Sequence, residues 1–185
     1  MEQLITSKSN PLAKQIRALR QRKERESSGL AWVEGIRLVG EAVQLGAAIE
    51  RLVVAPELLS SAFGSALLSE SVAPVSAVSA EVFASLAAKD NPQGLGAIVR
   101  QHWQELEAID LGHQPWWVGL SGISDPGNLG TIMRTCDAVG AAGVILIGEC
   151  TDPYDGAAIR GSMGALFSLG LVKTTWSAFS AWQRE

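Results

Sequence analysis

The chain has 185 residues, of which 47% are hydrophobic and 18% charged, a composition that supports a buried core and argues against disorder. No apolar run approaches the roughly 18 residues of a membrane helix, and the N-terminus lacks the apolar stretch of a signal peptide. The two cysteines have no CxxC spacing and there are only two histidines, so a disulfide framework or a zinc site has little support. The sequence predicts a soluble, cytoplasmic protein without a membrane segment or a metal.

The net charge of −4 is unevenly distributed along the chain. Residues 1–25 hold seven Lys or Arg and two acids, whereas the remaining residues hold eight basic and seventeen acidic side chains. A basic arm on an acidic body is typical of contact with a polyanion. A solvated, charge-rich helix explains the same pattern, and from the charges alone the two interpretations are about equally good.

The first hundred residues alternate between helical and strand patterns. Asn10-Pro11 is a helix start, and the apolar spacing predicts one helix that Ser27-Ser28-Gly29 ends. A short apolar run covers 30–33. Helices are then expected over 36–45, 57–71 and 80–88, and strands over 49–55, 74–78 and 95–100. This pattern predicts a small α/β domain over residues 1–100, followed by a polar linker over 101–114.

A second α/β unit is predicted over residues 115–185. The apolar run 116–123 is consistent with a buried parallel strand. It is followed by an expected helix over 128–139 and another strand over 143–147, which together make a βαβ unit. A turn and helix over 152–163, a strand over about 166–174 and a last helix from 176 complete the unit. Three strands are few for a parallel sheet that is covered on both faces.

The stretch SDPGNLGTIMRTCDAVG, residues 124–140, stands where ligands bind in open α/β sheets, beyond the carboxyl end of a strand. Asn128 is expected to cap the helix, whose first amides favour an anion, and Asp125 is expected to be a turn residue. One apolar stripe is formed by Leu129, Ile132, Met133, Cys136 and Val139. Arg134 lies opposite this stripe, so it is either a solvated surface charge, which physics alone favours, or a group for phosphate or a partner.

The glycines do not form a nucleotide-binding fingerprint. Gly122, Gly127 and Gly130 do not fit the spacing of a dinucleotide-binding turn. Arg160-Gly-Ser-Met-Gly164 is a patch of small residues, interpreted as close packing of a helix on the sheet.

Several motifs agree in order and spacing with a known family. The pattern Asp125-Pro-x-Asn128-x-Gly130-x-Ile132-x-Arg134-Thr135 resembles the first signature of the SpoU (TrmH-type) RNA 2′-O-ribose methyltransferases, of the SPOUT superfamily. Arg160-Gly-Ser-Met-Gly-Ala-Leu-Phe167 is similar to that family's RxSxGAlf segment. Three stretches resemble the family's N-terminal substrate-binding domain: Asn10-Pro-Leu-x-Lys14, Glu34-Gly35-x-Arg37 and Asn91-Pro-Gln-Gly94.

The resemblance implies an α/β fold: a small N-terminal α/β RNA-recognition domain, then the first half of a parallel-sheet SPOUT domain of the trefoil-knot type. It also implies a homodimer that uses S-adenosylmethionine to methylate a ribose 2′-hydroxyl, with ribosomal RNA as the expected substrate. Arg134 would orient that hydroxyl, and Asn128 would help to build the active site. The expected RNA contacts are Lys8, Lys14, Arg17, Arg20 and Arg37.

Two further motifs of the family, a Gly-Glu-Gly-like loop and an Ile-Pro-Met…Ser-Leu-Asn-Val segment, have no counterpart before Glu185. The chain is therefore expected to be a fragment of a longer protein, and no cofactor-binding residue is predicted. A catalytically silent RNA-binding module without the cofactor half is the alternative function. A small-molecule enzyme of Rossmann type is a third, against which the basic arm and the missing glycine fingerprint argue.

Overall fold

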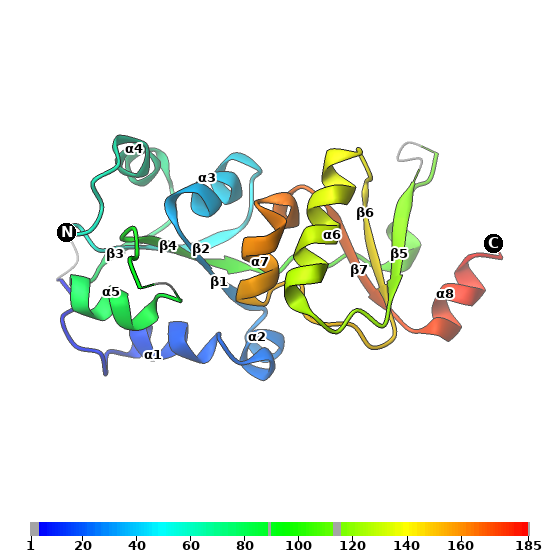
Figure 1. The fold of residues 1–185 in the computed structure, drawn as a ribbon, viewed down its shortest axis with the longest axis horizontal. Helices are drawn as coiled ribbons and strands as arrows, with labels where there is room; N and C mark the ends of the chain where they lie inside the picture. The colour runs from blue at the N-terminus through cyan, green and yellow to red at the C-terminus, as the bar shows by residue number, and fades with distance from the viewer. Residues whose placement is uncertain (1–3, 89, 113–115, 185) are drawn as a thin grey trace. The chain divides into compact units, whose positions relative to one another are not determined.

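A computed structural model describes residues 4–88, 90–112 and 116–184. The chain divides into two compact units, Met1–Gln101 and His102–Glu185. Both units are α/β structures, which confirms the predicted fold class (Figure 1). Residues 113–115, where the second domain was expected to begin, lie outside the described residues.

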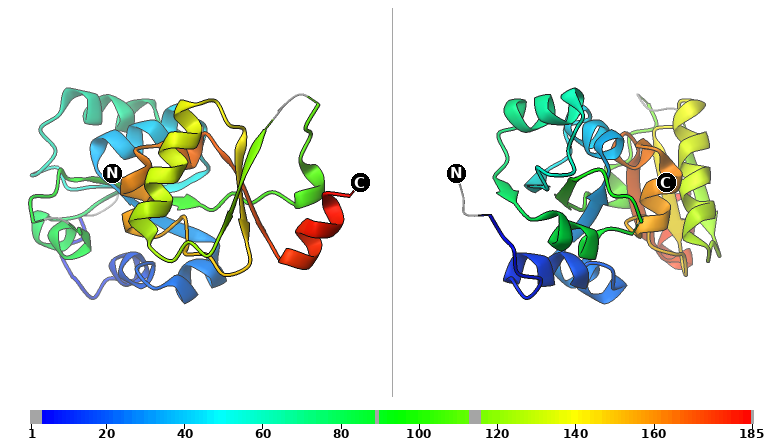
Figure 2. Two further views of the ribbon diagram at one scale, coloured as in Figure 1. Left: turned by 45° about the vertical axis from the view of Figure 1, so that its right-hand side comes forward. Right: turned by 60° about the vertical axis from the view of Figure 1, so that its left-hand side comes forward.

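The first unit is a four-stranded sheet between two layers of helices (Figure 1 and Figure 2). Its strands are β1 Leu30–Glu34, β2 Ile49–Val54, β3 Val75–Ala77 and β4 Leu95–Arg100, in the order β1-β4-β2-β3. Strand β4 is antiparallel to both β1 and β2, and β2 is parallel to β3. The helices are α1 Pro11–Ala18, α2 Arg22–Ser28, α3 Ile36–Gln44, α4 Ala62–Glu70 and α5 Ala80–Leu86. Helices α3 and α4 cover one face of the sheet, and α1 and α5 the other.

The single helix predicted from Asn10 to Ser28 is wrong, because the chain turns between α1 and α2. Helix α1 begins as expected, with the Asn10 side chain accepting a hydrogen bond from the Leu12 amide over 2.9 Å. It ends where the buried guanidinium of Arg25 donates to the carbonyl oxygens of Leu19 and Arg20, each over 2.9 Å. A side chain thus satisfies carbonyl groups that a continuing helix would have bonded to its own amides.

Helix α4 also begins later than predicted, at Ala62 rather than residue 57, because Ser61 is its N-cap. The Ser61 hydroxyl accepts a hydrogen bond from the Gly64 amide over 3.3 Å. The core between the sheet and helices α1 and α5 is fully apolar at its centre, with Ile16, Val53, Phe83, Leu86 and Ile98 all buried.

The second unit is a parallel three-stranded sheet, β5 Trp117–Ser121, β6 Gly143–Ile147 and β7 Gly170–Thr174, in that order. Its helices are α6 Pro126–Ala138, α7 Gly156–Ser162 and α8 Trp176–Trp182, with short 3₁₀ turns at Leu106–Ala108 and Ala165–Phe167. Figures 1 and 2 show α6 and α7 on one face of this sheet and α8 on the other.

Strand β5 differs from the buried strand that its apolar sequence predicted. It lies at the end of the sheet order, where three of its residues are half-buried and Gly119 and Ser121 are exposed, whereas every residue of the central strand β6 is buried. The Trp117 ring lies over its register partner Gly143 and over Gly170, which pairs with Gly143 on the next strand, and a Cβ on either glycine would collide with the ring. Glycine on two adjacent strands therefore makes room for the tryptophan of the third.

Part of the stretch expected as a linker packs onto the second unit. Gln104 forms a bridge with Val172, and Leu106 is 4% exposed in an apolar cluster with Ile145 and Ile147. Phe179 and Trp182 of α8 pack against the same cluster. Among the described segments, no helix is long and apolar enough to cross a membrane.

Candidate functional site

Helix α6 begins at Pro126, and Asp125 is its N-cap. The Asp125 carboxylate accepts a hydrogen bond from the Asn128 amide over 2.7 Å. The expectation that Asn128 caps the helix is therefore wrong, because Asn128 lies inside the first turn. A bound anion was expected at the first amides of α6. Pro126 has no amide hydrogen, and the Asn128 amide already donates to the Asp125 carboxylate, so this carboxylate takes the place of a bound anion. An Asp before Pro is the sequence signal for this cap, and interpreting Asp125 as a turn residue misses it.

Glycines hold α6 tightly against α7. A Cβ built on Gly130 would lie 2.9 Å from the Gly161 Cα, and one built on Gly161 would lie 3.1 Å from the Gly127 carbonyl oxygen. The small-residue patch at 160–164 thus packs a helix against a helix, rather than a helix on the sheet as expected. Because backbone meets backbone at this contact, α6 is fixed in position and so is the direction of its outer face.

Arg134 lies on the exposed side of α6, as the sequence predicts. The buried side consists of Leu129, Gly130, Met133 and Cys136. Val139, expected in the apolar stripe, is instead 55% exposed just after the helix ends. Arg134 forms no hydrogen bond or ion pair with any described residue, so its guanidinium is available to a ligand.

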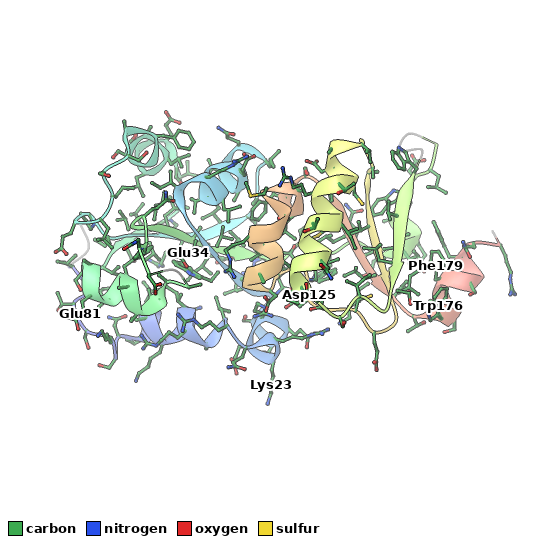
Figure 3. All side chains as sticks on the ribbon, in the orientation of Figure 1. Lys23, Glu34, Glu81, Asp125, Trp176 and Phe179 are labelled. Atoms are coloured by element: carbon green, nitrogen blue, oxygen red, sulfur yellow. The ribbon has the colours of Figure 1, made fainter. Side chains whose placement is uncertain are left out.

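Asn128 is also exposed, six residues before Arg134 and about 9 Å away along the helix axis. Its side chain has no hydrogen-bond partner in the described part of the chain. Figure 3 shows Asp125 at the start of α6, which is also the edge where β5 ends. Both predicted catalytic residues therefore lie on α6: Asn128 in its first turn at the carboxyl edge of the sheet, and Arg134 further along the helix as it runs back over the sheet.

Backbone hydrogen bonds join the loops at this edge. The Thr151 amide donates to the Ile123 carbonyl over 2.7 Å, and the Gly148 amide donates to the Thr174 carbonyl over 2.9 Å. Gly122 has a positive φ of 68°, so the turn from β5 toward α6 depends on a residue without a side chain. The bond between Thr151 and Ile123 holds the loop from which α6 begins against the loop that follows β6.

Two groups of the second unit have shifted pKa values. Burial raises the pKa of the Cys136 thiol. Burial also raises the pKa of Tyr154 to about 12, against the opposing effect of its hydrogen bond to the His102 backbone. Both groups stay protonated at neutral pH, so neither supplies a base. In the described chain, no three His, Cys, Asp or Glu side chains gather closely enough to hold a metal ion.

The basic residues predicted to contact RNA fall into two groups in the first unit. Lys8 forms an ion pair with Glu81 over 2.7 Å, and Figure 3 shows Glu81 on α5. Arg17 donates to the Lys8 carbonyl and, over 3.3 Å, to the Ser85 hydroxyl. Arg20 donates to three carbonyl oxygens at the end of α5, those of Ser85, Leu86 and Ala87.

The other two residues, Lys14 and Arg37, are exposed. Neither forms a hydrogen bond or ion pair within the described ranges of the chain. Lys23, also exposed, is on α2 in Figure 3. The basic arm therefore combines cations that bind the protein's own groups with cations that are free to bind another molecule.

The chain is thus an α/β protein of two units, the first with a mixed sheet and the second with a parallel sheet, and a capped helix leaves the carboxyl edge of the second sheet. Residues 10–97 match the MRM3-like substrate binding domain, and residues 115–185 match the SpoU rRNA Methylase family. The two matches fall in the two compact units.

Solved and curated proteins agree with these matches. The crystal structure of an AdoMet-bound rRNA methyltransferase from Sinorhizobium meliloti superposes with a TM-score of 0.84 and 36% identity, over 98% of this chain and 68% of that one. An uncharacterized tRNA/rRNA methyltransferase of Synechocystis is 34% identical over 87% of this chain and 58% of its own length. RlmP of Bacillus subtilis, a 23S rRNA guanosine 2′-O-methyltransferase, is 27% identical over 91% of this chain and 64% of its own.

The chain belongs to the SpoU (TrmH-type) methyltransferase family. It spans about three-fifths of the length of the two curated relatives.

Proposed function

We propose that this protein transfers a methyl group from S-adenosylmethionine to a ribose 2′-hydroxyl of RNA, with ribosomal RNA as the substrate. The observation that carries the proposal is Arg134: an exposed guanidinium without a protein partner, on a helix fixed by its packing on α7. The names of the relatives, an AdoMet-bound rRNA methyltransferase and a 2′-O-methyltransferase among them, support the same reaction.

The chemistry asks for a group that activates a poor nucleophile. The 2′-hydroxyl must lose its proton, here to solvent water, as its oxygen bonds to the methyl carbon and the bond from that carbon to sulfur breaks. Negative charge develops on the oxygen during this step. The Arg134 guanidinium can hold the adjacent phosphate through charge-assisted hydrogen bonds and stabilise that developing charge. Because a guanidinium is not normally deprotonated, Arg134 acts by orientation and electrostatics rather than as a base.

Asn128 has a positioning role in this proposal. Its exposed amide stands in the first turn of α6, where it can accept from or donate to the ribose and phosphate groups that Arg134 holds. S-adenosylmethionine, when bound, supplies an electrophilic methyl group on sulfur. We assign none of the described residues to the cofactor.

We further propose that RNA first contacts the N-terminal unit. Lys14 and Arg37 are free to bind phosphates, whereas Lys8, Arg17 and Arg20 would have to share bonds that they already make to the protein. Sequence-independent contacts of this kind supply affinity and register. The family resemblance also supports a homodimer that acts in the cytoplasm.

The test measures methyl transfer and RNA binding on the same variants. Tritium transfer from labelled S-adenosylmethionine to 23S rRNA is compared for the wild type, Arg134→Ala and Arg134→Lys, with filter binding of the same RNA. We expect Arg134→Ala to lose at least about a hundredfold in transfer, and Arg134→Lys to recover part of it. The RNA affinity of both Arg134 variants should stay within about twofold. At saturating RNA the control Lys23→Ala should transfer at the wild-type rate, because a lost phosphate contact weakens binding and not the chemical step. Equal losses of transfer and binding would contradict the role given to Arg134.

The second candidate function is an RNA-binding module without catalysis. The exposed cations Lys14 and Arg37, which pair with no described residue, favour it because they can bind RNA phosphates without a cofactor. Titration calorimetry with S-adenosylmethionine separates the two functions, because saturable binding excludes the silent module. RNA binding without any cofactor binding supports it.

A further inference from the structure

A cavity of about 410 Å³ lies between α3 and α4 in the first unit. Its volume falls in the range of about 300–1,000 Å³ that small-molecule sites occupy. Gly40 of α3 makes room for the ring of Phe63, since a Cβ on Gly40 would lie 2.9 Å from two ring carbons. The Phe63 side of the cavity is open, because this residue is 47% exposed.

Polar side chains without protein partners surround this ring. Arg37, Glu41 and Gln44 line the cavity from successive turns of α3. Arg37 and Glu41 stand four residues apart, a spacing at which ion pairs form on helices, yet they are not paired. Within the described ranges, none of the three forms a hydrogen bond or ion pair. Arg37 and Gln44 are exposed and Glu41 is half-buried, so all three side chains are accessible to a ligand beside the exposed aromatic ring.

The fourth polar group comes from the turn at Asn91–Gly94. The Gln93 side-chain oxygen accepts a hydrogen bond from the Ile36 amide over 3.2 Å. This bond fixes the amide group at the start of α3, and its nitrogen has no partner in the described part of the chain. Two stretches that resemble the family's N-terminal domain, around Gly35 and Gln93, thus meet at one wall of the cavity.

We propose that this cavity receives one unpaired base of the RNA, stacked on Phe63. The proposal rests on the proposed function and names a recognition site for that same substrate. Unpaired bases bind proteins by stacking on aromatic side chains and by hydrogen bonds along their edges. The Gln93 and Gln44 amides and the Glu41 carboxylate suit those edges, and the Arg37 guanidinium suits a neighbouring phosphate.

The charges of the site distinguish a base from an isolated phosphate. The formal charges of Arg37 and Glu41 cancel, and a carboxylate repels a phosphate held in the same cavity. A neutral, flat base meets no such repulsion. The Glu41 carboxylate only accepts hydrogen bonds, so it favours a base with N–H donors on adjacent atoms, as guanine has.

The first test uses four RNA hairpins that differ only in the central base of the loop, and a duplex of the same length. Binding is measured by fluorescence anisotropy with the full chain. We expect Phe63→Leu to bind the preferred hairpin about tenfold more weakly, because leucine fills the same space without an aromatic face. Phe63→Tyr should keep the wild-type affinity. The matched control is Val72→Ala, a fully exposed apolar residue of the same unit. Duplex binding should be the same for all these proteins.

The second test separates edge recognition from charge. Glu41→Gln should reduce the preference for the guanine hairpin over the other three hairpins. Arg37→Gln should weaken the binding of every RNA and lower the slope of log affinity against log salt concentration by about one. If wild-type protein binds the hairpins and Phe63→Leu binds them equally well, the base site is wrong and the proposed function stands. Parallel losses for hairpin and duplex would also overturn the base site. A wild type that binds no RNA overturns both proposals.

Discussion

The arginines of the N-terminal helices and the arginine of α6 carry the same charge, but the former bind groups of the protein itself and the latter does not. Arg17, Arg20 and Arg25 donate to carbonyl oxygens of neighbouring residues, and Arg25 is 3% exposed. Arg134 is exposed and bonds to no described residue. The difference shows that a cluster of positive charge in a sequence does not reveal how many of its cations are available to a ligand. Helix ends with unsatisfied carbonyl groups nearby take up some of them.

The largest expected effect is on Arg25, the most deeply buried of these side chains. Arg25→Met should lower the free energy of unfolding of the first unit by about 2–3 kcal/mol, because the Leu19 and Arg20 carbonyls lose a buried donor. Urea unfolding measures the change. The control is Arg22→Met, whose exposed ion pair with Glu26 should be worth less than about 0.5 kcal/mol. Similar values for both variants would show that burial does not distinguish the contributions of these two arginines to stability.

Tyr154 extends the comparison to the second unit, where its hydroxyl donates to the His102 carbonyl and accepts from the His102 amide. Its folded pKa of about 12 lies above the ordinary value near 10, so the native state keeps a proton that the unfolded chain loses. The contribution of Tyr154 to the free energy of unfolding is fully present below about pH 10. As the pH rises from about 10 to about 12, roughly 2 kcal/mol of this contribution is lost.

The chain has one tyrosine, so a tyrosinate absorbance titration reports this group directly. The absorbance should rise near pH 12 rather than near 10. Tyr154→Phe should unfold with the same free energy at pH 9 and pH 11, whereas the wild type should lose stability between them. An ordinary titration near pH 10 would show that the hydroxyl is open to solvent.

Arg20 and Lys14 allow the effect of a cation on stability to be compared with its effect on RNA binding. Arg20→Met should destabilise the first unit by about 1 kcal/mol, because three carbonyl oxygens at the end of α5 lose their donor. Lys14→Met should leave stability unchanged and weaken RNA binding. Urea unfolding and filter binding on both variants test the pair. If Arg20→Met weakens RNA binding without changing stability, Arg20 belongs with the free cations.

The smallest expected effect on stability is that of Arg134. Arg134→Met should change the free energy of unfolding by less than about 0.5 kcal/mol, since the side chain makes no polar contact with the described protein. A thermal melt beside the Arg25→Met variant gives the contrast. A large loss would mean that Arg134 supports the fold, and its proposed role in methyl transfer would then need another explanation.

The arginines also illustrate how far the sequence predicts the candidate site. Helical spacing placed Arg134 opposite the stripe of Leu129 and Met133, and the structure agrees, because periodicity reports one helix face directly. The same spacing could not predict the turn between α1 and α2. That turn depends on Arg25 reaching back to the Leu19 carbonyl, a contact that the apolar pattern does not encode.

Packing between elements decided the rest. The apolar run of β5 predicts a buried strand, but β5 lies at the end of the sheet order and is only partly buried. The sequence of a strand does not reveal which strands lie beside it. Likewise, Gly161 was visible as a small residue, yet only the fold shows that its partner is Gly130 of α6.

The sequence by itself determined the α/β class, most elements, the family motifs and the outward direction of Arg134. These features follow from local periodicity, helix caps and residue spacing. The tertiary structure alone decided which cations are free, how α6 is fixed, and that Phe63, Gly40 and Gln93 surround one cavity. These features depend on contacts between residues distant in the chain, and such contacts form only when the elements pack.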